Sequence, residues 1–482
     1  MPEVIVEVQI HTFMTRLIVV MSFSLIVRLG LWKQFGGFVV NSKKEITIGS
    51  FYRLSIPSMW RYFKSETLAF WMICFYFFLE YVRPQSIYPV VDFLPWAQIA
   101  LLGALIGSLV DQSVRWVSTQ FNLWLIVFFV LILFSSFFAY DSSVSYANLE
   151  SFYSWLIIYF LIINIVNTEK RLFIFLCIFF LASFKLSLSL SITWAQRGFS
   201  FTGWGLMGPP GFFQNSGELS IQMLVFWPLA WAFFKALKSD LNHTLYFILL
   251  LMPVTAIMVV LGASSRGAQL ALLAQLIIMN ASSIFRPKVI VSCIVAFAIL
   301  WTLLPQEQKD RFQIAGDDRS SIQRLLYWEN GVEMLNENPG LGVGFFNYIP
   351  YYERFYRDDI LYEGAELPHN IFIQVGADLG YPALIVYCII ILLSARKAYN
   401  IRVKFRKGVG ERFAISMVKY LNISLVGFVV AGQFVSVVYY PFLWIHLAIL
   451  VCCNHVLITS ENSNRKPLSR SKRYKAKRIN AY

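Results

Sequence analysis

Long apolar runs separated by short polar connections dominate the chain from about residue 66 onward. A helix needs about 20 apolar residues to cross a bilayer, so the pattern predicts about twelve transmembrane helices. They lie near residues 66–83, 93–110, 121–139, 151–166, 172–192, 219–236, 244–262, 267–285, 288–304, 369–395, 418–437 and 438–457. The predicted fold class is an all-α integral membrane protein with one large helical periplasmic loop.

The connections divide the chain into five predicted regions. The first is an uncertain N-terminal extension, either a surface helix or an extra span, because its weak apolar run contains Arg28. The regions are this extension at 1–58, transmembrane helices 1–9 at 59–304, the periplasmic loop at 305–368, transmembrane helices 10–12 at 369–458 and a basic cytoplasmic tail at 459–482.

Composition supports a membrane protein rather than a soluble one. Hydrophobic residues make up 57% of the chain and charged residues 14%, with a mean hydropathy of +0.60, whereas soluble domains carry about 25% charged residues. The net charge of +14 raises the possibility of nucleic-acid binding. However, the basic residues lie in short connections and in the tail, so we expect membrane lipids and no nucleic acid as partners. The six cysteines lack metal-ligand spacing, and we expect no disulfide, metal or cofactor.

The charged connections favour a single orientation. With the C-terminus in the cytoplasm, the basic connections at 167–171, 235–240 and 397–412 all face the cytoplasm, as the positive-inside rule requires. The opposite side receives the segment 193–218 and the predominantly acidic loop 305–368. We therefore expect a multi-pass protein of a bacterial inner membrane, with its functional face in the periplasm.

Three polar residues stand out on that face. Arg266 lies between two spans, Arg324 lies on a predicted loop helix, and His369 begins a span. An arginine at a membrane edge needs a partner or a wet cavity, and histidine suits proton transfer near neutral pH. Each also has a plain alternative: a snorkelling arginine, a solvated arginine and a histidine satisfied by the helix start.

Together these residues suggest a reaction. Two guanidinium groups can hold a diphosphate through charge-assisted hydrogen bonds, and a neutral histidine can deprotonate a hydroxyl nucleophile. This set suits glycosyl transfer from a lipid diphosphate. The sequence contains no P-loop and no GxGxxG motif, so we expect no nucleotide site.

Further residues could support such a site. Arg197 and Glu218 lie in the Gly/Pro-rich segment on the same side and could line the donor or acceptor path, although the segment also fits a plain irregular loop. Asn370 directly follows His369. On the loop helix, Ile322, Leu325, Leu326, Val332 and Leu335 form an apolar stripe, with Ser320 or Ser321 as the expected cap.

Three segments resemble the O-antigen ligase/polymerase superfamily of bacterial envelope glycosyltransferases. They are SSRGAQLAL, RLLYWENGVEMLNENPGLGVGFFNY and PHNIFIQVGADLGYPAL. The resemblance implies a metal-independent transfer of an undecaprenyl-diphosphate-linked glycan, with His369 as catalytic base and Arg266 and Arg324 on the diphosphate. One departure concerns the His-Asn segment, which in ligases ends in Gly-x-x-Gly. Here Gly380 is followed by Tyr-Pro-Ala.

Several functions stay open. The first hypothesis is an O-antigen ligase that transfers the glycan onto lipid A-core. The alternatives are an O-antigen or exopolysaccharide polymerase and a protein O-glycosylation ligase. A lipid or solute transporter is a further alternative, which the lack of an internal repeat and the clustering of charge on one face disfavour.

Overall fold

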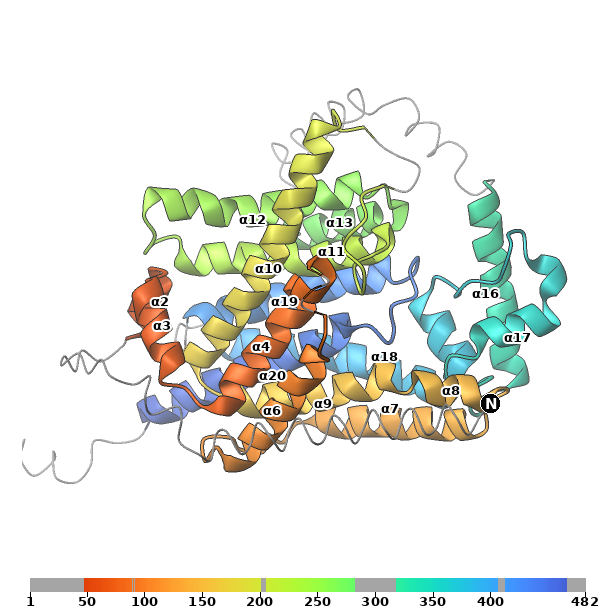
Figure 1. Ribbon diagram of the computed structural model, residues 1–482, viewed down its shortest axis with the longest axis horizontal. Coiled ribbons are helices and arrows are strands. Elements are labelled where there is room, and N and C mark those ends of the chain that lie inside the picture. The colour runs from red at the N-terminus through yellow and green to blue at the C-terminus, as the bar shows by residue number, and fades with distance from the viewer. Residues whose placement is uncertain are drawn as a thin grey trace, which may run out of the picture.

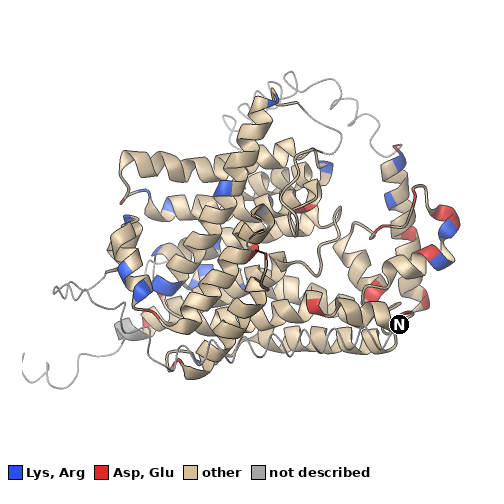
Figure 2. Ribbon diagram, viewed as in Figure 1, with Lys and Arg blue, Asp and Glu red and all other residues tan. Residues whose placement is uncertain are grey.

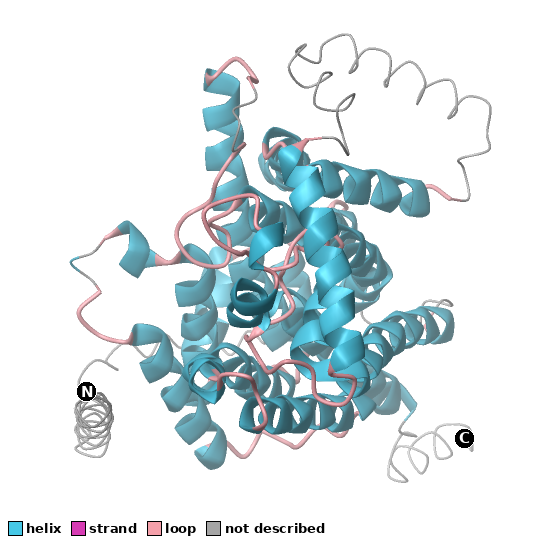
Figure 3. Ribbon diagram, turned by 90° about the vertical axis from the view of Figure 1, so that its right-hand side faces the viewer, coloured by secondary structure: helices cyan, strands magenta, loops and turns pink. Residues whose placement is uncertain are grey.

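The computed structural model describes residues 47–88, 90, 92–200, 205–281, 318–405 and 412–465. All regular elements in these residues are helices, joined by loops (Figure 3). The all-helical fold class is therefore confirmed for this part of the chain.

Eight helices of the described chain are long and apolar enough to cross a membrane. They are α7 (Gln120–Phe137), the joined pair α8 (Ser142–Asn148) and α9 (Glu150–Ile165), α10 (Glu169–Gln196), α11 (Ser216–Leu237), α12 (His243–Gly262), α18 (Ile371–Lys404), α19 (Arg412–Ala431) and α20 (Pro441–Arg465) (Figure 1). The prediction of a multi-pass membrane protein is confirmed.

The predicted number of about twelve spans is met only in part. Three predicted spans form helices of 14 or 15 residues, which are α4 (Leu68–Val82), α6 (Trp96–Val110) and α13 (Arg266–Met279). The expected span at 288–304 lies outside the described residues. The predicted boundary between the last two spans is a connection instead, because α19 ends at Ala431 and α20 begins at Pro441.

The helix α11 forms the centre of the bundle. Nearly all its side chains are buried, and it packs against α12 and α19, while α13 packs against α19. The buried amide of Gln275 on α13 donates at 2.8 Å to the carbonyl oxygens of Leu224 on α11 and Ile423 on α19. Because polar side chains inside a membrane bundle hold helices together, this amide fixes α13, and with it Arg266, against the core.

A helical subdomain covers one end of the bundle. It contains α16 (Arg319–Glu337), α17 (Tyr348–Phe355) and the short 3₁₀ helix η3 (Arg357–Asp359), drawn in teal and cyan in Figure 1. The side chains of Tyr327, Tyr348 and Tyr352 form a small core of their own, and α16 packs against α18. The predicted large helical loop is thus an ordered subdomain over residues 318–368.

The start of α16 differs from the expectation. Asp318, not Ser320 or Ser321, caps the helix, and its carboxylate accepts from the backbone N–H of Ser321 at 3.3 Å. The predicted apolar stripe is also split. Leu335 is buried, but Ile322, Leu325 and Val332 are exposed, because the face that packs inward carries Tyr327, Asn330 and Met334.

A kink in α18 joins the subdomain to the bundle. Gly380 has a φ of 79°, which interrupts the helix. The carbonyl oxygens of Ala377 and Asp378 accept instead from Val343 and Gly344 at 2.8 and 3.0 Å. A side chain at Gly342 would come 2.4 Å from the α18 backbone. The segment with Gly342 and Gly344 therefore packs against the kink at Gly380. Its backbone N–H groups take up the carbonyl oxygens that the interrupted helix leaves without an intrahelical partner.

The two ends of the bundle differ in charge. We call the end that carries α16, α17 and η3 the acidic end. The opposite end carries α2 (Ile48–Tyr52), α3 (Ile56–Lys64) and the α9–α10 connection, and we call it the basic end. Figure 2 shows lysine and arginine gathered at the basic end, on the left, and most aspartate and glutamate at the acidic end. The short helix α5 (Pro84–Ile87) follows α4.

Candidate active site at the acidic end

His369 lies just before α18 begins. Its backbone is left-handed, with a φ of 51°, a conformation that few residues with a side chain adopt. The backbone N–H donates to the Ser436 hydroxyl at 2.8 Å, and the side chain is 27% exposed. The imidazole is therefore held in one place but is accessible.

Glu366 faces the imidazole, with 3.0 Å between its Oε2 and Nε2 of His369. An ionised carboxylate only accepts hydrogen bonds, so a neutral imidazole donates from Nε2 and keeps the lone pair of Nδ1 free. The hydrogen bond from His369 holds the pKa of Glu366 below its usual range, although burial opposes this. An ionised carboxylate beside a histidine stabilises the imidazolium that forms when the histidine accepts a proton.

Arg266 is the first residue of α13 and points to the start of α16. Its Nη2 lies 3.2 Å from Oδ1 of Asp318 and 3.3 Å from the Ser321 hydroxyl, and the side chain is partly exposed. Burial opposes ionisation of Asp318, but the Ser321 hydroxyl and Arg266 outweigh it and lower its pKa. Arg266 thus joins two elements that are separated by the long connection between α13 and α16.

Arg324 lies on α16, close enough to Arg266 for their charges to repel. Burial lowers the pKa of Arg324, and the positive charge of Arg266 lowers it further, while Asp318 and Glu366 act in the opposite direction. Within the described part of the chain, no hydrogen bond satisfies its guanidinium. An anion placed between the two cations would relieve the repulsion and accept hydrogen bonds from the Arg324 guanidinium.

The connection 432–440, between α19 and α20, holds these elements together. The Gly432 carbonyl accepts from the first backbone N–H of α18 at 2.8 Å. A side chain at Gly267, next to Arg266, would come 2.4 Å from the ring of Phe434. The same ring lies 6.4 Å from that of Trp328 on α16. The connection therefore touches α13, α16 and α18 at once.

Asn370 has a structural position. It caps α18, and its side-chain oxygen accepts from the backbone N–H of Phe372 at 2.9 Å. Its amide nitrogen donates to Gln433 at 3.3 Å, and the residue is buried. Asn370 thus fixes the helix that follows His369.

Glu218 lies near His369, and the two side chains interact electrostatically. Its carboxylate forms a capping box with Asn215 at the start of α11 and accepts from the Tyr440 hydroxyl at 3.0 Å. Arg197, by contrast, is exposed at the end of α10, which projects beyond its neighbours at the top of Figure 1. The structure brings Glu218 to the cluster, whereas no hydrogen bond or ion pair within the described residues joins Arg197 to it.

Sequence reasoning missed four members of this arrangement, which are Asp318, Glu366, Ser436 and Tyr440. A signal existed for two of them. Asp318 lies three residues before Ser321, the spacing of a helix cap, and Glu366 lies three residues before His369. No local pattern marks the other two, since they approach only when α20 packs into the bundle.

The cluster contains the groups for one kind of chemistry. It combines a free imidazole nitrogen, a carboxylate behind it and two neighbouring guanidinium groups. Within the described residues, no group of three His, Cys, Asp or Glu side chains could hold a metal ion.

A family model described as "O-Antigen ligase" matches residues 250–388. The matched segment includes Arg266, Arg324 and His369 and extends through the kink of α18. No curated protein matches the chain. The family match confirms the resemblance that the three sequence motifs indicated.

Proposed function

We propose that this chain, whose residues 250–388 match the O-antigen ligase family model, is a glycosyltransferase that moves a glycan from an undecaprenyl-diphosphate carrier to an acceptor hydroxyl. The transfer takes place at the periplasmic face of the inner membrane, with the acidic end in the periplasm and the C-terminus in the cytoplasm. Lipid A-core is the proposed acceptor, which makes the protein an O-antigen ligase.

One observation carries this proposal: Arg324 repels Arg266 and is attracted by Glu366, the carboxylate that holds Nε2 of His369. Arg266 and Arg324 come from different helices, so they form a two-sided cradle for a diphosphate. Bidentate guanidinium–phosphate contacts suit this role better than lysine contacts would. The asymmetric distribution of charge between the two ends supports the proposed orientation.

The proposed reaction balances in one step. Nδ1 of His369 takes the proton from the acceptor hydroxyl, and the acceptor oxygen forms a bond to the anomeric carbon of the donor glycan. The bond from that carbon to the carrier diphosphate breaks, and the electron pair stays on the diphosphate oxygen. Arg266 and Arg324 stabilise this developing charge, while Glu366 stabilises the imidazolium.

A polymerase is the second candidate, and one feature favours considering it. The ligase segment has a second glycine three residues after the first. Here Ala383 occupies that position and is fully buried. A polymerase would use the same donor site but accept a hydroxyl of another lipid-linked glycan. A protein O-glycosylation ligase would accept a protein hydroxyl.

The test is a transfer assay on purified protein with an undecaprenyl-diphosphate glycan and lipid A-core, in the presence of EDTA and without ATP. We expect glycosylated lipid A-core from the wild type and none from His369→Ala. Lengthening of the donor glycan alone would identify a polymerase. A folded protein that neither transfers nor polymerises with cognate substrates would contradict glycosyl transfer and return transport to consideration.

A further inference from the structure

At the basic end, far from the site above, α3 presents an exposed face with an unusual mixture of side chains. Ile56 is 76% exposed and Trp60 is 54% exposed. Arg61 and Lys64 are exposed beside them on the same face, and Nζ of Lys64 lies 5.3 Å from the centre of the Trp60 ring. Isoleucine and tryptophan in water are costly for a monomeric surface, especially next to each other.

The other face of α3 is already in use. Met59, Tyr62 and Phe63 pack against the hydrophobic core, and the carbonyl oxygen of Phe63 accepts from the indole N–H of Trp71 on α4 at 2.6 Å. The helix therefore cannot rotate to bury Ile56 and Trp60 against the bundle. A nine-residue helix is marginal on its own, but this one is held in shape by its packed face.

The direction of α3 agrees with a position at a membrane surface. In Figure 1 the helix, drawn in red, runs across the left end of the bundle, crosswise to long helices such as α7 and α12. If these helices cross the bilayer, α3 lies along its surface. Helices in that layer carry lysine and arginine next to tryptophan and aliphatic side chains.

The local charge is positive and available. Arg53, Arg61 and Lys64 are exposed. The neighbouring acids are engaged elsewhere. Glu66 binds Arg171 at 2.6 Å, Glu169 accepts from the Tyr52 hydroxyl, and Asp240, which also attracts Arg53, forms an ion pair with Arg412. The exposed face is therefore complementary to an anionic surface.

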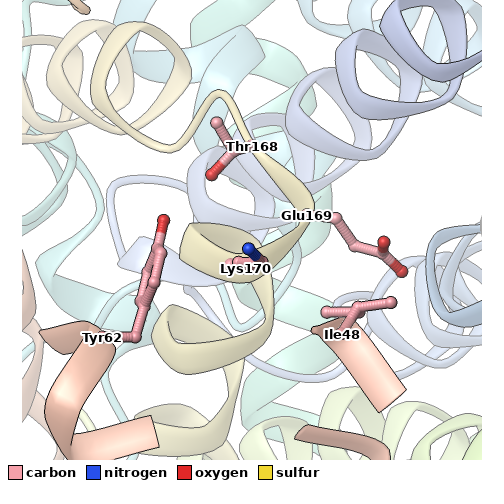
Figure 4. A pocket seen from close by; sticks show the side chains of 5 residues that line it. All are labelled: Ile48, Tyr62, Thr168, Glu169 and Lys170. Carbon is pink, nitrogen blue, oxygen red and sulfur yellow. The ribbon is translucent and has the colours of Figure 1, made fainter. Parts of the chain in front are cut away.

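A hollow next to α3 offers room for a lipid headgroup. It has a volume of about 380 Å³ and is lined by Ile48, Tyr62, Thr168, Glu169 and Lys170. Figure 4 shows Tyr62 on one side of it and the turn that carries Thr168 and Lys170 on the other. A hydroxyl and an ammonium group are suitable donors to a phosphate oxygen.

We infer that α3 is an interfacial helix that binds the anionic lipid surface at the basic end of the bundle. Ile56 and Trp60 enter the boundary between headgroups and acyl chains, and Arg53, Arg61 and Lys64 contact lipid phosphates. This role is independent of glycosyl transfer, since it concerns the opposite end of the molecule.

A depth measurement on the full-length protein in vesicles tests the inference. A fluorophore is attached at Trp60→Cys, with Tyr362→Cys on the acidic end as the control position, and quenching by spin-labelled lipids is recorded. The native cysteines that the structure describes are buried or half-buried. We expect the label at position 60, and not at 362, to be quenched, about twofold more in vesicles with phosphatidylglycerol than in phosphatidylcholine alone.

A matched pair of charge variants separates specific contact from general attraction. Arg53→Gln/Arg61→Gln/Lys64→Gln removes three positive charges from the basic end, one directly after α2 and two on α3. Arg396→Gln/Lys397→Gln/Arg402→Gln removes three exposed positive charges from the end of α18. Only the first should abolish the response to phosphatidylglycerol, with both variants retaining the wild-type helix content.

Two results would overturn the inference. The label at position 60 could be unquenched in vesicles with phosphatidylglycerol, or it could be quenched equally in both lipids.

Discussion

The two ends of the bundle surround their arginines differently. The basic end neutralises Arg171, whereas the acidic end places two arginines, Arg266 and Arg324, close together. Arg171 is buried, 2.6 Å from Glu66 and 3.6 Å from Asp111, and it donates to the Ile165 carbonyl at 3.0 Å. Its charge and its hydrogen bonds are fully used. Arg266 lies within hydrogen-bond distance of the Asp318 carboxylate and the Ser321 hydroxyl. Burial and the charge of Arg266 lower the pKa of Arg324.

This difference separates an arginine that stabilises the fold from arginines that can bind an anion. A buried arginine whose charge is neutralised by an ion pair holds helices together, but it offers a ligand neither net charge nor an open hydrogen-bond donor. Two neighbouring cations repel each other, which costs stability and favours the binding of an anion. The largest effects of mutation should therefore be on stability at the basic end and on activity at the acidic end.

Replacing His369 with alanine should have the largest effect on activity. Loss of a positioned general base typically costs 10²–10⁴-fold in rate, and we expect kcat to fall by about that factor while donor affinity stays close to the wild-type value. Single-turnover transfer and donor binding, measured on the same preparation, check this. Full activity in the variant would show that another group takes the proton.

Arg324→Ala should lower kcat/KM by about 10²–10³-fold, as expected when a group that stabilises the leaving-group charge is removed. Arg324→Lys should restore only part of the activity, because lysine keeps the charge but loses the bidentate geometry. Thermal unfolding should show no loss of stability, since burial and the neighbouring charge of Arg266 disfavour the charged guanidinium of Arg324. A large drop in stability with unchanged kinetics would make Arg324 structural.

Arg171→Met should produce the reverse result. The change leaves Glu66 and Asp111 without their partner in a buried position, which costs about 3–5 kcal/mol. We expect lower thermal stability but wild-type kcat for the folded fraction. The double variant Arg171→Met/Glu66→Gln should recover part of the stability, and a lack of recovery would argue against the ion pair as the cause.

Ser436→Ala should have a smaller effect on activity. The backbone N–H of His369 would lose its acceptor, and such a hydrogen bond contributes about 0.5–1.5 kcal/mol, or up to about tenfold in rate. We expect kcat to fall with little change in KM, and Ser436→Thr to restore it. Equal losses from alanine and threonine would indicate a packing role for this position.

The smallest effect concerns acid stability. The lowered pKa of Asp318 means that its stabilising contribution is complete above the ordinary aspartate pKa of about 4 and is lost as pH falls through the lowered value. Asp318→Asn should reduce the loss of unfolding free energy between neutral and acid pH by about 1 kcal/mol or less. Unfolding temperatures measured between neutral and acid pH check this, with Asp358→Asn as an exposed control.

The spans were largely predictable from sequence, whereas the partners of the site residues were not. Apolar runs such as 172–192 define α10 because a bilayer requires their length, and the charges of short connections gave a consistent orientation. The predicted span at 267–285 was too long at its end, because α13 ends at Met279, where the polar residue Asn280 follows. His369 and Arg266 stood out as polar residues at span ends, and Arg324 stood out on the predicted loop helix.

What joins those residues depends on packing between distant segments. The acceptor for the His369 backbone is Ser436, on a connection that the apolar pattern did not resolve. The cap of α16 was assigned to serine, but the aspartate before it has the stronger acceptor and also binds Arg266. Such interactions have no periodicity in the sequence, because they follow from how the connection 432–440 meets α13, α16 and α18.

The most direct test of the difference between the two ends is the affinity for the undecaprenyl-diphosphate glycan, measured on the wild type, Arg266→Ala/Arg324→Ala and Arg171→Met. We predict that the acidic-end variant loses donor binding by at least about 10²-fold, while folded Arg171→Met binds as the wild type does. Wild-type affinity in Arg266→Ala/Arg324→Ala would contradict the assignment of the two arginines to the diphosphate.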